Sequence, residues 1–111
     1  MAATQEWVSV ARLDEIPPGA VKAVWLGDEA VALVNRDGAL HAVGGTCPHR
    51  LGPLAEGRLV GDDLACPWHG FRFDPVTGRA TMPRAHLGVP TFAVRVVGEE
   101  IQIAVSPASD E

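Results

Sequence analysis

Both cysteines of the chain and two of its four histidines fall into two short clusters. The clusters read CPH at residues 47–49 and CPWH at residues 66–69, with the 16 residues 50–65 between them. Thiolate and imidazole are common metal ligands, and ligands one or two residues apart on a tight loop can reach one metal centre together. The proline after each cysteine fixes the backbone φ and stiffens both loops. The sequence therefore predicts a metal site.

The order of the ligands within each loop separates two kinds of metal site. A structural zinc site usually groups its ligands as Cys-x2-4-Cys and His-x3-5-His, whereas each loop here offers one Cys and one His. Such mixed loops suit two metals better than one, because both loops then contribute to both metals. A zinc staple for a small domain remains the alternative, and it predicts a colourless protein.

The residues of the two clusters resemble the cluster loops of the Rieske ferredoxin family. The motif Cys-x-His, 16 residues, Cys-x2-His is complete, and the strings CPHRLGPLAEG and CPWHGFRFDPVTG look like the two loops of that family. The resemblance extends from Trp7 through a loop at Pro83 to the segment 92–105. It implies one 2Fe–2S cluster in which two histidines replace two cysteines on one iron. The implied ligands are Cys47 and Cys66 on the inner iron, and His49 and His69 on the outer iron near the surface.

The resemblance also implies an all-β fold of three antiparallel β-sheets, with a small cluster-binding lobe at about residues 45–75 inserted into a base made from the rest. We expect residues 1–111 to form a single Rieske domain, because a chain of this length can bury one core but not two. The composition agrees with an all-β fold. Twelve Gly and nine Pro interrupt the chain so often that long helices are almost excluded.

Short β-branched segments between these glycines and prolines predict the strands. The dipeptides at 27–28, 37–38, 61–62 and 98–99 lie between apolar runs and predict hairpin turns. The predicted strands are Trp7–Leu13, Ala20–Leu26, Ala30–Asn35, Ala39–Val43, Thr91–Val97 and Ile101–Val105. Alternation predicts two inward-facing rows, one of Phe92, Val94 and Val96 and the other of Ile101, Ile103 and Val105.

Departures from two related groups restrict the implied function. Respiratory and photosynthetic Rieske proteins add one cysteine to each loop and a membrane anchor. This sequence has Gly52 or its neighbours and Trp68 at those loop positions, and we expect no anchor. Rieske oxygenase α subunits carry a second domain with a mononuclear iron, for which only His41 and His86 would remain here. We therefore expect an electron carrier and not an enzyme that oxidises an organic substrate.

Aromatic residues after the second loop predict the properties of the cluster. Respiratory Rieske proteins have Ser and Tyr hydroxyls there, which donate to the cluster sulfurs, whereas this sequence has Phe71 and Phe73. Fewer donors stabilise the reduced cluster less, so we expect a reduction potential near the low end of the Rieske range, about −150 mV. We expect Trp68, Leu51 and Phe71 to shield the cluster from water, and Pro83 resembles the proline that covers its third side.

The charge of the chain argues against nucleic acid and membranes as partners. Nine Lys and Arg against 14 Asp and Glu give a net charge of −5, which repels phosphate backbones and anionic lipid. Residues 50–84 hold five arginines and four carboxylates, so the acidity lies outside them. Arg50 and Arg72 could orient a partner, although a solvated charge is the default for each.

Further features predict where the protein is found and in what state. No apolar run approaches the ~20 residues that span a bilayer, and the N-terminus lacks the pattern of a signal peptide. We therefore expect a cytoplasmic protein. We expect a monomer, because no long apolar face is left once the sheets pack. A lone histidine in a strand, such as His41, is most often structural.

Together these features predict a ferredoxin that carries one electron from a flavin-dependent reductase to the Rieske centre of a terminal oxygenase of the ring-hydroxylating type. The alternative is the small Rieske-type subunit of an assimilatory nitrite reductase, which is similar in size and fold but permanently bound. Many such subunits lack one or more ligands, so the complete set of four favours the shuttle.

Overall fold

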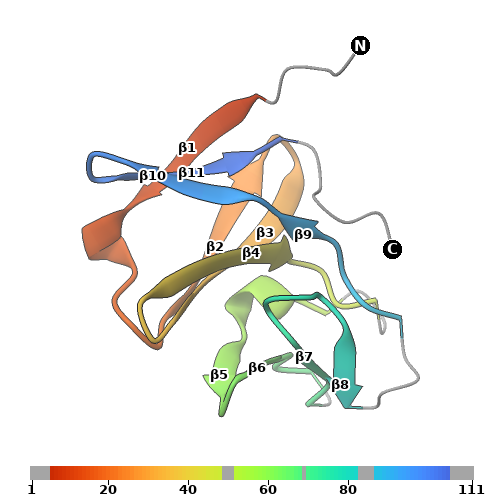
Figure 1. The fold of residues 1–111 in the computed structure, drawn as a ribbon. Coiled ribbons are helices and arrows are strands. Elements are labelled where there is room, and N and C mark those ends of the chain that lie inside the picture. Colours follow the sequence, from red (N-terminus) through yellow and green to blue (C-terminus); the bar gives the residue numbers. More distant parts are fainter. Residues whose placement is uncertain (1–5, 49–51, 69, 83–86, 106–111) are drawn as a thin grey trace.

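A computed structural model describes residues 6–48, 52–68, 70–82 and 87–105. These residues form three antiparallel sheets stacked in layers (Figure 1), which confirms the predicted fold class. The upper sheet has the order β1-β11-β10, with β1 Trp7–Arg12, β10 Val94–Val97 and β11 Glu100–Ala104. The middle sheet has the order β2-β3-β4-β9, with β2 Val21–Leu26, β3 Glu29–Arg36, β4 Ala39–Gly44 and β9 Thr91–Phe92. The lower sheet has the order β5-β6-β7-β8, with β5 Arg58–Val60, β6 Asp63–Ala65, β7 Arg72–Phe73 and β8 Ala80–Met82.

The helical segments of the described residues are two short 3-10 turns, η1 (Leu13–Glu15) and η2 (Leu54–Glu56). Frequent Gly and Pro leave few uninterrupted stretches in which a longer helix could form. No helix in this part of the chain has the length and hydropathy that crossing a membrane requires.

The middle sheet separates two cores, and its strand β3 is buried on both faces. Ala32 and Val34 belong to the core shared with the lower sheet, whereas Val31 and Leu33 belong to the core shared with the upper sheet. All four are fully buried. Successive side chains of a strand point to opposite faces, so a strand between two layers needs a continuous apolar run. The segment AVALV supplies this run.

The four predicted hairpin turns are confirmed, and a residue in the left-handed region occupies each. Gly27, Gly61 and Gly98 have φ values of 60°, 62° and 63°, and the third turn has Asp37 at 56° followed by Gly38 at 95°. Such values are needed because two-residue turns that match the twist of the flanking strands require positive φ. The turns place β2 against β3, β3 against β4, β5 against β6, and β10 against β11.

The single strand predicted for residues 91–97 is wrong, because the chain crosses between two sheets there. Strand β9 pairs with β4 in the middle sheet, and β10 pairs with β11 in the upper sheet. The predicted inward row therefore fails in part. Phe92 is buried, but Val96 is 45% exposed on an edge strand. In the following segment Ile101 and Ile103 are buried as predicted, whereas Val105 lies beyond the end of β11 and is exposed.

The lower sheet was not among the predicted strands, because its strands have only two or three residues each. A pattern of period two cannot be recognised over so short a stretch. Leu64 and Phe73 pair across β6 and β7 and are fully buried in the core that also contains Ala32 and Val34. This shared core fastens the lower sheet, which we call the lobe, to the middle sheet.

Asn35 is the buried polar side chain among the described residues. Its amide nitrogen donates to the carbonyl oxygen of Ile16 at 2.8 Å, and its Oδ1 accepts a hydrogen bond from the backbone N–H of Gly38 at 2.8 Å. Buried polar groups are normally satisfied in this way. Asn35 thereby ties the loop after η1 to the β3–β4 turn.

We expect Asn35→Ala to lower the free energy of unfolding by about 2 kcal/mol, because it leaves a buried carbonyl and a turn N–H without their partners. Urea unfolding of the cluster-loaded protein measures the change. Gln102→Ala is the control, because Gln102 makes its side-chain hydrogen bonds at the exposed surface of the upper sheet. Equal effects of the two substitutions would contradict this role of Asn35.

Candidate metal centre

The two predicted cysteine ligands come from separate loops and meet in one core. Cys47 follows β4, and Cys66 follows β6 directly. They are 0% and 3% exposed, both belong to the core between the middle sheet and the lobe, and no disulfide joins them. The two predicted histidine ligands, His49 and His69, lie outside the described residues.

Gly52 connects the two cysteines. Its carbonyl oxygen accepts a hydrogen bond from the backbone N–H of Cys47 at 2.8 Å and another from Leu54 at 2.9 Å. On its other side, a Cβ built at Gly52 would lie 3.0 Å from Sγ of Cys66 and 3.2 Å from two ring atoms of Trp68. The first loop therefore approaches the second so closely that a Cβ at this position would require Sγ of Cys66 or the ring of Trp68 to shift by a few tenths of an ångström.

Three other glycines flank the cysteine loops, and they have different roles. A Cβ at Gly45 would collide with the backbone of Ala30 at 2.8 Å, and one at Gly44 would touch the ring of Pro90 at 3.0 Å. Gly70 has a φ of 71° and open space beside it. Of these positions, Gly52 is thus the one where glycine permits close approach to a cysteine.

Two of the predicted shielding residues lie beside the cysteines. The carbonyl oxygen of Phe71 accepts a hydrogen bond from the backbone N–H of Cys66 at 2.7 Å, and its side chain packs against the core that contains both thiols. Trp68 is 47% exposed, with its ring against Gly52, so it covers the junction of the two loops from outside. Leu51 and Pro83 lie outside the described residues.

The cysteine half of the site fits an iron–sulfur cluster. Thiolates are the ligands that hold such clusters, and here two thiols lie without a disulfide in an apolar core. The backbone hydrogen bonds of Cys47 and Cys66 fix the loops that carry them. Within the described ranges no group of three or more His, Cys, Asp or Glu is placed to hold a metal ion, and two of the four predicted ligands fall outside those ranges.

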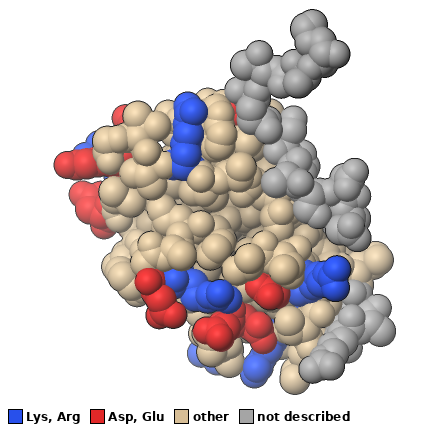
Figure 2. Space-filling model, viewed as in Figure 1, with Lys and Arg blue, Asp and Glu red and all other residues tan. Residues whose placement is uncertain are grey.

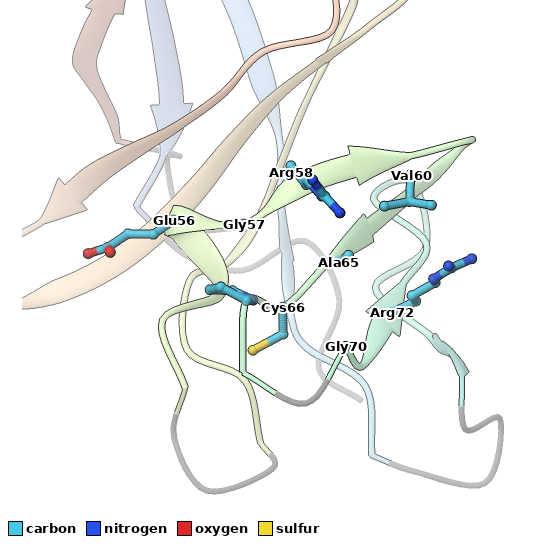
Figure 3. Close-up of a pocket in the computed structure, with 9 residues that line it drawn as sticks. Glu56, Gly57, Arg58, Val60, Ala65, Cys66, Gly70 and Arg72 are labelled. Carbon is cyan, nitrogen blue, oxygen red and sulfur yellow. The ribbon is translucent and has the colours of Figure 1, made fainter.

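A hollow of about 450 Å³ adjoins Cys66 on the outer side of the lobe (Figure 3). Arg58, Ala65 and Arg72, from β5, β6 and β7, line it together with Cys66 and Pro67. The sequence indicated Arg72 as a possible partner contact but gave no sign of Arg58. Only the pairing of the three short strands places the two arginines on either side of Ala65.

His41 lies in β4, on the lobe side of the middle sheet. It pairs with Val34 across β4 and β3. Burial lowers the pKa of His41, the guanidinium of Arg36 lowers it further, and the carboxylate of Asp74 partly opposes both. The lowered pKa means that His41 favours its neutral form in the folded protein, and its structural role stays a prediction.

The sequence of residues 6–93 matches the Rieske [2Fe-2S] domain family. The chain belongs to this family. It is 32% identical over 103 residues to the ferredoxin component of a naphthalene 1,2-dioxygenase system of Pseudomonas aeruginosa, a match that covers 93% of this chain and 99% of that relative.

Two solved Rieske structures have the same fold. The complex of reduced oxygenase and oxidized ferredoxin in carbazole 1,9a-dioxygenase contains a chain with a TM-score of 0.86 and 28% identity, covering 96% of this chain and all of that one. A putative NADH-dependent nitrite reductase small subunit from Mycobacterium tuberculosis has a TM-score of 0.81 and 26% identity, covering 92% of this chain and 96% of that one.

As a member of the Rieske family, the chain carries one Rieske-type 2Fe–2S cluster and is an electron carrier. The buried pair Cys47 and Cys66 agrees with this cofactor. These matches give no support to the alternative of a structural zinc site.

We expect Gly52→Ala to loosen the cluster, because the new methyl group would press against Sγ of Cys66 and the ring of Trp68. About 1 kcal/mol of strain corresponds to a roughly fivefold faster loss of iron. The decay of visible absorption in the presence of an iron chelator measures this rate. Gly61→Ala is the control, since Gly61 has open space beside it and its variant is strained only through its own positive φ of 62°, with no contact to a cysteine. Equal decay rates for the two variants would refute the close-contact argument.

We expect His41 to make the folded protein less stable at acidic pH. Its pKa is lowered by folding, so the unfolded chain binds the proton more tightly. The resulting loss of unfolding free energy is absent above the ordinary histidine pKa of about 6.5 and grows as the pH falls below that value. His41→Gln should therefore reduce the loss of unfolding free energy between pH 7.5 and pH 5.5, as measured by urea unfolding, whereas His86→Gln serves as control. If His41→Gln left the pH dependence of the unfolding free energy unchanged, this contribution of His41 would be refuted.

Proposed function

We propose that this Rieske chain accepts one electron from a flavin-dependent reductase and delivers it to the Rieske centre of a terminal oxygenase. The observation that carries this proposal is the match along 99% of a relative named as the ferredoxin component of a dioxygenase system. The ferredoxin–oxygenase complex of carbazole 1,9a-dioxygenase supports the oxygenase as the acceptor.

We propose Cys47 and Cys66 as ligands of one iron, and His49 and His69 as ligands of the other. The two cysteines are buried in one core without a disulfide, as a pair of thiolate ligands requires. The histidines follow the cysteines by two and three residues, which is a spacing short enough for each loop to contribute one ligand to each iron.

The bound cluster supplies reversible one-electron oxidation and reduction. The chain itself excludes water from the thiols by packing Leu64, Phe71 and Phe73 into the same core. Backbone hydrogen bonds from Cys47 to Gly52 and from Cys66 to Phe71 hold the two loops in place, which limits movement when the charge changes. Because Phe71 and Phe73 have no hydroxyl groups to donate to the cluster sulfurs, we expect a reduction potential of about −150 mV.

We propose that residues 1–111 form a single domain. The proposed ligands lie in a cluster-binding segment at about residues 45–75, which overlaps the lower sheet called the lobe above. The sheet of the lobe continues through β8 to Met82. A cytoplasmic monomer fits a carrier that must meet two partners in turn, and the net charge of −5 disfavours self-association and binding to nucleic acid or anionic membranes.

The small subunit of a nitrite reductase is the second candidate, favoured by the TM-score of 0.81 to such a chain. The two functions differ in whether the chain diffuses. Gel filtration of the protein expressed with its neighbouring genes separates them, because a permanently bound subunit elutes with a large complex and a shuttle elutes alone.

We expect His69→Ala to abolish the Rieske electron paramagnetic resonance signal after dithionite reduction, and with it electron delivery from reductase to oxygenase. Loss of one of four ligands opens the coordination of one iron. His41→Gln is the matched control, because it removes a histidine outside the proposed site. Iron and acid-labile sulfide are assayed on the wild type and on both variants. An electron-delivery rate in His69→Ala equal to that of the wild type would refute the ligand assignment.

A further inference from the structure

Two arginines face each other across the outer surface of the lobe. Arg58 of β5 pairs with Ala65 of β6, and Ala65 pairs with Arg72 of β7. Directly paired residues of antiparallel strands share one face of a sheet, and neighbouring strands lie about 4.8 Å apart. The two arginine backbones are therefore about 10 Å apart, with the small side chain of Ala65 between them.

The space above Ala65 is the hollow of about 450 Å³ beside Cys66. In Figure 3 the side chains of Arg58 and Arg72 lie on the same side as Ala65 and Val60, whereas the carboxylate of Glu56 points the opposite way. The one acidic residue that lines the hollow is thus turned away from both guanidinium groups.

Neither of these arginines has an acidic partner within the described residues, where the ion pairs belong to Arg12. Arg36 and Arg95 also have hydrogen-bond acceptors, namely the carbonyl oxygen of Asp62 and the side chain of Gln102. Arg58 and Arg72 are therefore available to a ligand. A guanidinium group presents planar, paired N–H donors that match a carboxylate, and two such groups at one hollow can hold the same carboxylate from both sides.

We propose that this hollow receives an Asp or Glu side chain of the partner protein that donates the electron. The proposal rests on the proposed function, because it requires a donor protein. It adds a docking position on the lobe, beside Cys66 and lined by residues of β5, β6 and β7.

The charge of the cluster decides between donor and acceptor. Reduction adds one negative charge close to Cys66, which lines the same hollow. A carboxylate held there is repelled more strongly by the reduced protein than by the oxidised protein. An electron donor must bind the oxidised protein and dissociate from the reduced protein. A hollow that binds a carboxylate more tightly in the oxidised state therefore suits the donor.

A protein side chain fits this position better than a free anion. The net charge of −5 opposes the accumulation of small anions around the chain. A carboxylate on a partner surface is brought to the hollow by the other contacts of the interface. The interleaved acidic and basic side chains over the lower half of the face in Figure 2 leave the lobe close to neutral, so the attraction is local to the two arginines.

The test measures binding of an N-acetylated, C-amidated hexaglutamate peptide to the cluster-loaded full chain by isothermal titration calorimetry at low ionic strength. We expect the double variant R58Q/R72Q to bind the oxidised form at least roughly tenfold more weakly than the wild type does, because charge-assisted hydrogen bonds are lost. The matched control for the single variants R58Q and R72Q is R79Q, which likewise removes one charge, from an exposed residue of the same lobe outside the hollow. R79Q should stay within roughly twofold of the wild type. R58Q and R72Q alone are measured as well, in case the double variant is not recovered folded.

Three results would overturn the proposal. A loss of affinity in R79Q equal to that in R58Q and in R72Q would mean that the peptide senses only overall charge. Equal or tighter binding to the dithionite-reduced protein would exclude the donor as the occupant. Free glutarate binding as tightly as the peptide would make the hollow a small-anion site. Peptide binding needs no electron transfer, so any of these three results would leave the proposed function intact. Conversely, a protein that binds the peptide but fails to deliver electrons would count against the proposed function alone.

Discussion

Two thiols must be held in one dry core by loops that contain almost no regular structure, and the rest of the molecule depends on this constraint. Cys47 and Cys66 are separated in sequence by a 3-10 turn and a β-hairpin, yet both are buried in one core. Gly52 makes this possible, because it accepts the N–H of Cys47 on one side and leaves room for Sγ of Cys66 on the other. A Cβ at this point would make tight contacts with Sγ of Cys66 and the ring of Trp68, which would have to shift to accommodate it.

The layers above the lobe supply the rigidity that its short strands lack. Strand β3 is buried on both faces and gives the lobe a fixed surface to pack against. Backbone hydrogen bonds join the loops to this base. The N–H of Ala55 in η2 donates to the carbonyl oxygen of Gly45 after β4, and the N–H of Val89 before β9 donates to that of Gly78 between β7 and β8. A carrier benefits from such support, since a site that moves little on gaining an electron loses little energy in reorganising.

The distribution of charge adds a second requirement. The chain is acidic overall, but charges of both signs alternate over the lobe (Figure 2). A partner that approaches the lobe meets local features instead of a uniform field, and the hollow between Arg58 and Arg72 is one of them. Specificity for a redox partner then comes from the geometry of a few charged groups on the lobe, while the excess of acidic residues lies elsewhere on the chain.

The sequence by itself determined the chemistry and most of the base. The spacing of Cys47, His49, Cys66 and His69, the continuous apolar run of β3 and the turn residues at Gly27, Asp37, Gly61 and Gly98 are local signals, and local physics is enough to interpret them. Tertiary structure alone decided three things. It divided residues 91–97 between two sheets, because a strand's neighbours, and not its own pattern, decide which sheet it joins. It assembled the lobe from strands of two or three residues, which carry no readable periodicity. It also brought Arg58, Ala65 and Arg72 into one row, since the register of pairing between strands depends on the packing of Leu64 and Phe73 beneath them.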